Sequence, residues 1–335
     1  MRTIHLLNWD LKSIEEILPQ IKAQGFDSIQ INPMQPFKTL NEFHWYMSYQ
    51  PLGFRIGNMF GTKEDLKRLC QKANAMGIGI IVDVICNHTA NKSDEEPLIP
   101  YEGVDKELLS RPDFWKPRIM MKNGDDRKDA TQHLIGLPGL DLRNPDLKKI
   151  VFRYLDELRQ CGVKGYRFDA AKHIGLPKEG VTFFPEVKKY IDKYDMVAYG
   201  EFLGGDKEWR DEFAEYIPIL SSFSCTNSED KERMVFFESH DTFLNNDGHS
   251  TRNITTKQLI RMYPLLTALH ENTIVYVRPE KAPYNPFKRD IGVMESPKYA
   301  FENDILTSNT IREANNQEKE KELVKTNNKV LTKIR

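Results

Sequence analysis

The chain has 335 residues, of which 39% are hydrophobic, and its 48 lysines and arginines nearly balance 49 aspartates and glutamates. This balance argues against a nucleic-acid-binding protein, which normally has a basic surface, and favours a neutral substrate. No run approaches the roughly 20 apolar residues of a membrane helix, and the polar start does not resemble a secretory leader, so we expect a soluble protein of the cytoplasm unless a leader was removed.

Helix and strand signals alternate from the beginning of the chain. Ser13 and Glu16 have the spacing of a capping box and predict a helix, which a strand over residues 27–31 follows. Thr62 marks the start of a second helix. The continuous apolar run 78–83 is typical of a strand that is buried on both faces of a parallel sheet.

The alternation resumes after residue 143 with a helix that Asn144 and Pro145 begin. Later strands are predicted over 163–169, 196–201, 217–224 and 272–277, and one more begins near residue 234. Helices are predicted over 184–191 and 256–270. This order predicts a parallel sheet, and the number of units favours a closed eight-stranded (β/α)8 barrel of the TIM type.

Residues 89–143 interrupt this pattern. They lack clean periodicity, are rich in Pro, Asp and Lys, and are too long for an ordinary connection. We interpret them as a subdomain inserted after the third strand, which leaves 1–88 and 144–310 for the barrel. The charged residues 311–335 read as a solvated helix end or tail.

Three carboxylates stand out because each closes a short apolar run that reads as a strand: Asp169, Glu201 and Asp241. Burying a carboxylate costs several kcal/mol unless it is paired, so such residues should gather where water or substrate can reach them. In a parallel barrel that place is the rim formed by the carboxyl ends of the strands. The sequence therefore predicts an enzyme that uses carboxylates.

These acids lie in motifs that become specific when they are taken together. The motifs are 83–88, 165–173, 200–201 and 237–241; each alone could be a salt-bridged strand end. In this order they resemble the four signature regions of the α-amylase family of glycoside hydrolases, and 137–141 resembles its fifth. Residues 45–51 and 168–174 look most like bacterial α-amylases of the Bacillus subtilis type. The resemblance covers roughly residues 3–300.

The resemblance implies a role for each carboxylate. Asp169 corresponds to the nucleophile, Glu201 to the acid/base, whose pKa should be raised, and Asp241 to a third carboxylate that binds sugar hydroxyls. Retaining hydrolysis needs a nucleophile and an acid about 5 to 5.5 Å apart. Arg167, two residues before Asp169 on the same strand, is expected to keep Asp169 ionised.

The resemblance also implies residues that bind substrate and metal. The substrate residues are Tyr49, Gln50, His88, Arg167, Lys172, His173 and His240. Tyr49 resembles a platform on which a glucose ring stacks, with a core tyrosine as the alternative. The calcium ligands would be Asn87, the Thr131 carbonyl, Asp141 and the His173 carbonyl. Such oxygen ligands would fix the insertion beside the cleft, although no EF-hand-like loop is present and calcium rests on the resemblance alone.

The expected function is retaining hydrolysis of internal α-1,4 bonds in starch, glycogen or maltodextrin. A 4-α-glucanotransferase using the same residues and a non-catalytic glucan-binding protein on a decayed barrel remain alternatives. Two departures from the family stand out. Too few residues follow the last strand for the usual β-sandwich domain, and the connection between the sixth and seventh strands is short for a helix.

Overall fold

The computed structural model describes the chain except for residues 40–43, 223–232, 245–250, 252–253, 255–269 and 279–335. The predicted helix over 256–270, the charged tail and the connection between the sixth and seventh strands therefore lie, wholly or almost wholly, outside the described residues. Within the described ranges, none of the helices has the length and apolar character needed to cross a bilayer.

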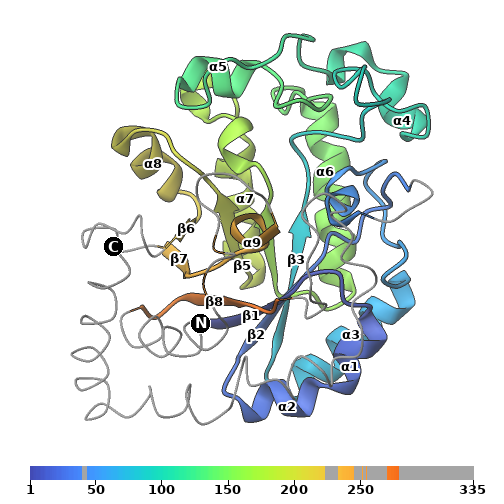
Figure 1. The fold of residues 1–335 in the computed structure, drawn as a ribbon, viewed down its shortest axis with the longest axis vertical. Helices are drawn as coiled ribbons and strands as arrows, with labels where there is room; N and C mark the ends of the chain where they lie inside the picture. Colours follow the sequence, from blue (N-terminus) through green and yellow to red (C-terminus); the bar gives the residue numbers. More distant parts are fainter. Residues whose placement is uncertain (40–43, 223–232, 245–250, 252–253, 255–269, 279–335) are drawn as a thin grey trace.

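Eight parallel strands close into a barrel in chain order, and β1 pairs with both β2 and β8 (Figure 1). The strands are β1 (Arg2–Leu6), β2 (Ser28–Ile31), β3 (Gly79–Val84), β4 (Gly165–Phe168), β5 (Val197–Glu201), β6 (Ile219–Ser222), β7 (Arg233–Phe236) and β8 (Thr273–Tyr276). This confirms the (β/α)8 barrel. β1 was not among the strands predicted from the sequence.

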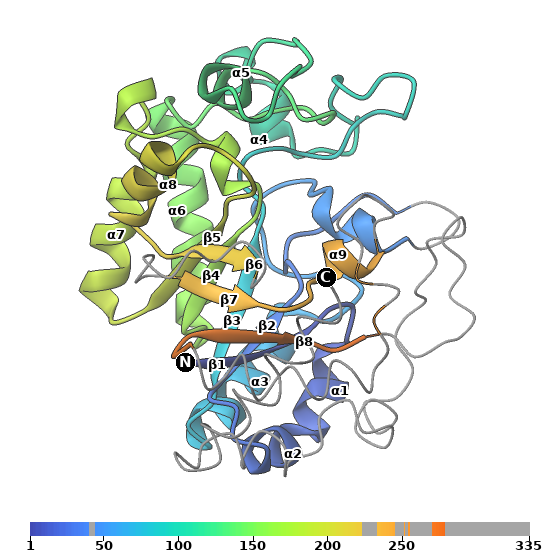
Figure 2. The same ribbon diagram turned by 60° about the vertical axis from the view of Figure 1, so that its left-hand side comes forward.

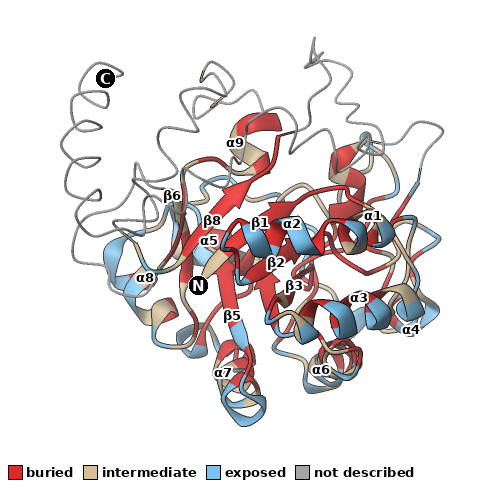
Figure 3. Cartoon of the chain, turned by 90° about the horizontal axis from the view of Figure 1, so that it is seen from below, coloured by how far each residue is buried: buried red, intermediate tan, exposed pale blue. Residues whose placement is uncertain are grey.

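The described helices pack outside the barrel or lie at its carboxyl end. They are α1 (Leu11–Glu16), α2 (Leu18–Ala23), α3 (Lys63–Ala75), α4 (Lys106–Leu109), α5 (Arg127–Gln132), α6 (Pro145–Gln160), α7 (Phe183–Tyr194), α8 (Lys207–Ala214) and α9 (His240–Leu244). Figure 3 shows buried strands inside, with exposed outer faces on α3 and α7. Such one-sided burial is the reason that amphipathic helices form here.

Two helix starts test the sequence signals. Thr62 caps α3 as predicted, and a capping box joins it to Asp65. The predicted box of Ser13 and Glu16 is wrong, because Asp10 is the cap and accepts a hydrogen bond from the Ser13 amide at 2.8 Å. The predicted single helix is also divided into α1 and α2, since Pro19 in the first turn of α2 has no N–H to donate.

The insertion leaves the barrel after β3 and returns at α6. Figure 2 shows α4 and α5 beyond the ends of the strands, where β3 points. A bridge between His88 and Gly139 joins this segment to the barrel, and another between Trp115 and Leu140 lies within it. The limits 89–143 remain a prediction from the sequence, but the segment borders the end of the barrel at which the carboxylates gather.

Candidate active site

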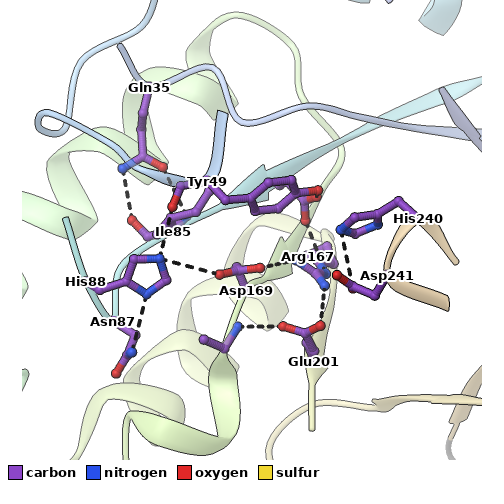
Figure 4. A network of polar contacts seen from close by, with 12 residues as sticks. Gln35, Tyr49, Ile85, Asn87, His88, Arg167, Asp169, Glu201, His240 and Asp241 are labelled. Atoms are coloured by element: carbon purple, nitrogen blue, oxygen red, sulfur yellow. Dashed lines mark hydrogen bonds and ion pairs between the residues drawn. The ribbon is translucent and has the colours of Figure 1, made fainter. Parts of the chain in front are cut away.

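The predicted carboxylates meet at the carboxyl end of the barrel (Figure 4). Asp169 directly follows β4, and Glu201 is the last residue of β5. Asp241 does not close a strand as predicted: β7 ends at Phe236, and Asp241 lies in the first turn of α9. The apolar run before Asp241 was therefore read too far, because it includes the connection between β7 and α9.

Arg167 organises this group from within β4. Its side chain is only 1% exposed. Nη1 donates to Asp169 Oδ1 at 2.6 Å, and Nη2 lies 3.0 Å from Glu201 Oε1. Since both nitrogens belong to one guanidinium, the two carboxylates lie side by side. Nε lies 3.3 Å from Asp83 Oδ1 on β3, so one cation joins three carboxylates.

Sequence reasoning missed Asp83 as a member of this cluster. Asp83 is fully buried and its Oδ2 accepts hydrogen bonds from the Tyr49 hydroxyl at 2.9 Å and from Gln30 Nε2 at 3.3 Å. Tyr199 in turn donates to Gln30 Oε1 at 2.8 Å. The available signal was a carboxylate inside the apolar run 78–83, because such a residue requires a buried partner.

The pKa order of the carboxyl groups differs from the prediction. Burial and the charge of Glu201 raise the pKa of Asp169 well above its usual value. Burial also acts to raise the pKa of Glu201, but Arg167 and the Ala170 amide outweigh it and lower that pKa. These directions differ from the raised pKa expected for Glu201 and from the ionised state expected for Asp169.

Ala170 supports the anion of Glu201 through its backbone. Its amide donates to Glu201 Oε2 at 2.9 Å. Ala170 adopts a left-handed conformation with φ of 47°, which is unfavourable for a residue with a Cβ atom. From this conformation the chain enters the turn Ala171–His173.

The motif histidines border the same cluster and are buried. His88 Nε2 lies 3.0 Å from the Tyr49 carbonyl oxygen and 4.0 Å from Asp169 Oδ2. His240 Nε2 lies 3.3 Å from Asp241 Oδ2. Burial lowers the pKa of His88 to about 4 and that of His240 to about 3, so both rings are neutral near pH 7.

Tyr49, Gln50 and Lys172 are three further residues that were predicted to bind substrate. Tyr49 is 8% exposed and stacks on His240 at 5.1 Å between ring centroids, which favours the core alternative for this residue. Gln50 is partly exposed, and its backbone amide donates to the Met47 carbonyl. Lys172 donates to the Leu203 carbonyl.

His173 lies in the turn after β4. Its Nδ1 is 3.0 Å from the Ala130 carbonyl oxygen, so the ring contacts the insertion. Burial lowers the pKa of this ring to about 4. The His173 side chain thus contacts the insertion and also interacts electrostatically with Glu201 of the carboxylate cluster.

The residues predicted to bind calcium do not fit an ion. The Nζ of Lys116 donates to Asn87 Oδ1 at 3.1 Å and to the His173 carbonyl at 2.6 Å. Asp141 accepts from Arg143 Nε at 2.8 Å and from Arg143 Nη2 at 2.6 Å. Burial lowers the pKa of Lys116 to about 8, which leaves mainly the ammonium at pH 7.

Thr131 completes the predicted calcium ligands. It is buried in α5, and its hydroxyl donates to the Arg127 carbonyl at 2.8 Å. Across the described residues, no group of three or more histidine, cysteine or acidic side chains has the arrangement of a metal site. Among the predicted ligands, Lys116 contacts Asn87 Oδ1 and the His173 carbonyl, and Arg143 contacts the Asp141 carboxylate.

Comparisons with known proteins agree with this geometry. The family model for the α-amylase catalytic domain matches residues 7–118. An α-amylase of Clostridium acetobutylicum is 35% identical over 181 residues, and one of Butyrivibrio fibrisolvens is 24% identical over 367 residues. The chain is similar to proteins of the α-amylase family. These matches cover 51% and 88% of this chain but only 22% and 37% of the relatives, so the chain spans less than half of their length.

Solved structures of this family share the fold. The α-amylase of Geobacillus thermoleovorans, solved with acarbose, has a TM-score of 0.68 at 18% identity and covers 91% of this chain and 76% of its own. The cyclomaltodextrin glucanotransferase CldA has a TM-score of 0.67 at 20% identity, with 91% and 70% covered. The fold of the α-amylase family therefore accommodates both hydrolases and transferases.

The free protein is expected to lose stability between about pH 6.5 and 8. Burial and the charge of Glu201 raise the pKa of Asp241 to about 8. The folded protein thus keeps a proton that an unfolded aspartate releases above about pH 3.9. The binding of this proton contributes fully to the free energy of unfolding below about pH 3.9, and the contribution is lost as the pH rises through 8. The buried histidines of the site change the free energy of unfolding only below about pH 6.5, which is the pKa of an unfolded histidine.

Urea unfolding at pH 6.5 and pH 8 measures this effect. Asp241→Asn cannot titrate and should show a smaller fall in the free energy of unfolding than the wild type over this interval. The same fall in both proteins would contradict the assignment of the proton to Asp241.

Proposed function

We propose that this chain is a retaining glycoside hydrolase that cleaves internal α-1,4-glucosidic bonds of starch, glycogen or maltodextrin. The observation that carries the proposal is the pairing of Asp169 and Glu201 on the single guanidinium of Arg167. A hydrogen bond between Asp241 and Glu201 adds the third carboxylate. Similarity to α-amylases supports the choice of substrate.

In the proposed reaction, Asp169 attacks the anomeric carbon while the bond to the leaving sugar breaks. Glu201 gives its proton to the leaving oxygen, and a covalent glycosyl ester forms on Asp169. Glu201 then takes a proton from water, which attacks the anomeric carbon and releases Asp169. Asp241 binds hydroxyls of the same sugar, and His88 and His240 border it.

The pKa order of the free site adds a requirement to this mechanism. Before substrate binds, burial favours the proton on Asp169, whereas Arg167 and the Ala170 amide favour the anion of Glu201. In the proposed mechanism, substrate binding places one proton on Glu201. Exclusion of water by the sugar and an oxygen that accepts from Glu201 both act in this direction.

Release of reducing ends from soluble starch tests the proposal, and the products from maltoheptaose separate its alternatives. Oligomers longer than the substrate would indicate a glucanotransferase, whereas shorter products alone indicate hydrolysis. Folded protein that binds maltooligosaccharides but releases no product would indicate the glucan-binding alternative.

Finer features of the chain are also proposals. We propose a cytoplasmic location, which the buried free thiols of Cys70, Cys86 and Cys161 support. We also propose a division into a barrel (1–88 and 144–310) and an inserted subdomain (89–143), and a likeness to the Bacillus subtilis type based on 45–51 and 168–174.

A further inference from the structure

A buried lysine connects the insertion to two loops of the barrel. Lys116 is 6% exposed, and its amide donates to the Gly139 carbonyl at 2.9 Å within the insertion. Its Nζ reaches Asn87 Oδ1 at 3.1 Å and the carbonyl of His173 at 2.6 Å. Asn87 follows β3, and His173 ends the turn after β4. One ammonium therefore joins three segments that are far apart in the sequence.

These contacts are of the kind that a bound cation would make. Both acceptors are oxygen atoms, and both belong to the set that the family resemblance implies for calcium. Asp141 supplies the nearby negative charge that favours a cation at Lys116. A lysine ammonium is a compact point charge with three donors, so it can bind diverging oxygen acceptors.

We propose that the ammonium of Lys116 takes the place of a calcium ion in this chain and fixes the insertion to the barrel. Calcium and an ammonium would repel each other at this position, and the ion would have to displace Lys116 from both acceptors. It would also compete with Arg143, which holds the Asp141 carboxylate through Nε and Nη2. The chain should therefore fold and remain stable without calcium.

The same contacts make Lys116 a positioning residue for the candidate active site. Asn87 precedes His88, whose Nδ1 lies 3.4 Å from Asn87 Nδ2. His173 ends the turn that begins after Ala170, and the Ala170 amide holds Glu201. Lys116 thus fixes the two loops that flank Asp169. This part of the inference rests on the proposed function, whereas the stabilising role does not.

Thermal unfolding with EDTA and with added CaCl2 tests the stabilising role without any substrate. The wild-type Tm should stay within about 1 °C in both, because no site is left for the ion. Lys116→Met keeps an unbranched apolar side chain of similar volume but loses the charged Nζ, and should lower Tm by roughly 5 °C or more, since buried acceptors lose their partner. Lys128→Met, at an exposed lysine of α5, should leave Tm unchanged.

Kinetics on maltoheptaose, at a temperature at which both variants are folded, test the positioning role. Lys116→Met should lower kcat by about tenfold or more, whereas Lys128→Met should not. A fall in wild-type Tm with EDTA, a rise with CaCl2, or an unchanged Tm of Lys116→Met would overturn the proposal. If Lys116→Met does not fold, the wild-type measurements with chelator and calcium still decide the replacement of the ion.

Discussion

Glu201→Gln is expected to lower kcat on starch by about 10²-fold to 10⁴-fold, the usual contribution of a general acid and base. Gln has nearly the same shape and can still accept the hydrogen bond that the Ala170 amide donates to Glu201 Oε2 at 2.9 Å. It cannot protonate the leaving oxygen. We therefore expect binding of maltooligosaccharides to persist while turnover is lost, as measured by reducing-end release and by calorimetry.

A substrate with a good leaving group separates the roles of the two carboxylates. An aryl maltoside needs little protonation of its leaving oxygen, so Glu201→Gln should retain formation of the glycosyl ester and a burst of released phenol. Asp169→Asn should lose the burst as well, because it removes the nucleophile. Glu208→Gln is a suitable control, since the side chain of Glu208 is 81% exposed on α8. A wild-type rate for Glu201→Gln on starch would contradict the assignment.

Arg167→Met is expected to produce the largest loss of stability. It removes the cation that lies within 3.3 Å of carboxylate oxygens of Asp83, Asp169 and Glu201. The remaining buried carboxylates then have to bind protons or lose their partners, which costs roughly 3–5 kcal/mol. Activity should be lost with it, because the guanidinium also sets the relative positions of Asp169 and Glu201.

Urea unfolding of matched variants measures this cost. Arg55→Met is the control, because the Arg55 side chain is 60% exposed in its ion pair with Asp105 and should matter by at most about 1 kcal/mol. If Arg167→Met cannot be obtained folded while Arg55→Met can, the difference still agrees with the expectation. A loss for Arg167→Met as small as that for Arg55→Met would show that this cation does not hold the cluster together.

The sequence predicted the barrel because helices and strands with clear periodicity alternate along most of it. Thr62 and Asn144 each start a helix as expected, since their caps are local. The cap of α1 was misplaced because Asp10 and Ser13 carry equally good local signals. The position of Asp241 was misread for a similar reason, since an apolar run continues past the end of β7.

The residues of the candidate active site could be predicted better than the pKa values of their side chains. Motifs identify Asp169 and Glu201, but the pKa of each depends on which group Arg167 and the Ala170 amide contact, and only the fold decides that. The role of Lys116 was not predicted for the same reason. A lysine in an irregular segment gives no sign that its ammonium will bind oxygen atoms of Asn87 and His173.

The anomeric form of the first product tests the central claim most directly. Proton NMR of maltoheptaose with the wild-type protein, recorded early in the reaction, should show the α-anomer of the new reducing end before mutarotation adds the β-anomer. This result follows from double displacement at Asp169 with Glu201 as acid and base. Initial release of the β-anomer, or no product at all from the folded protein, would contradict the account.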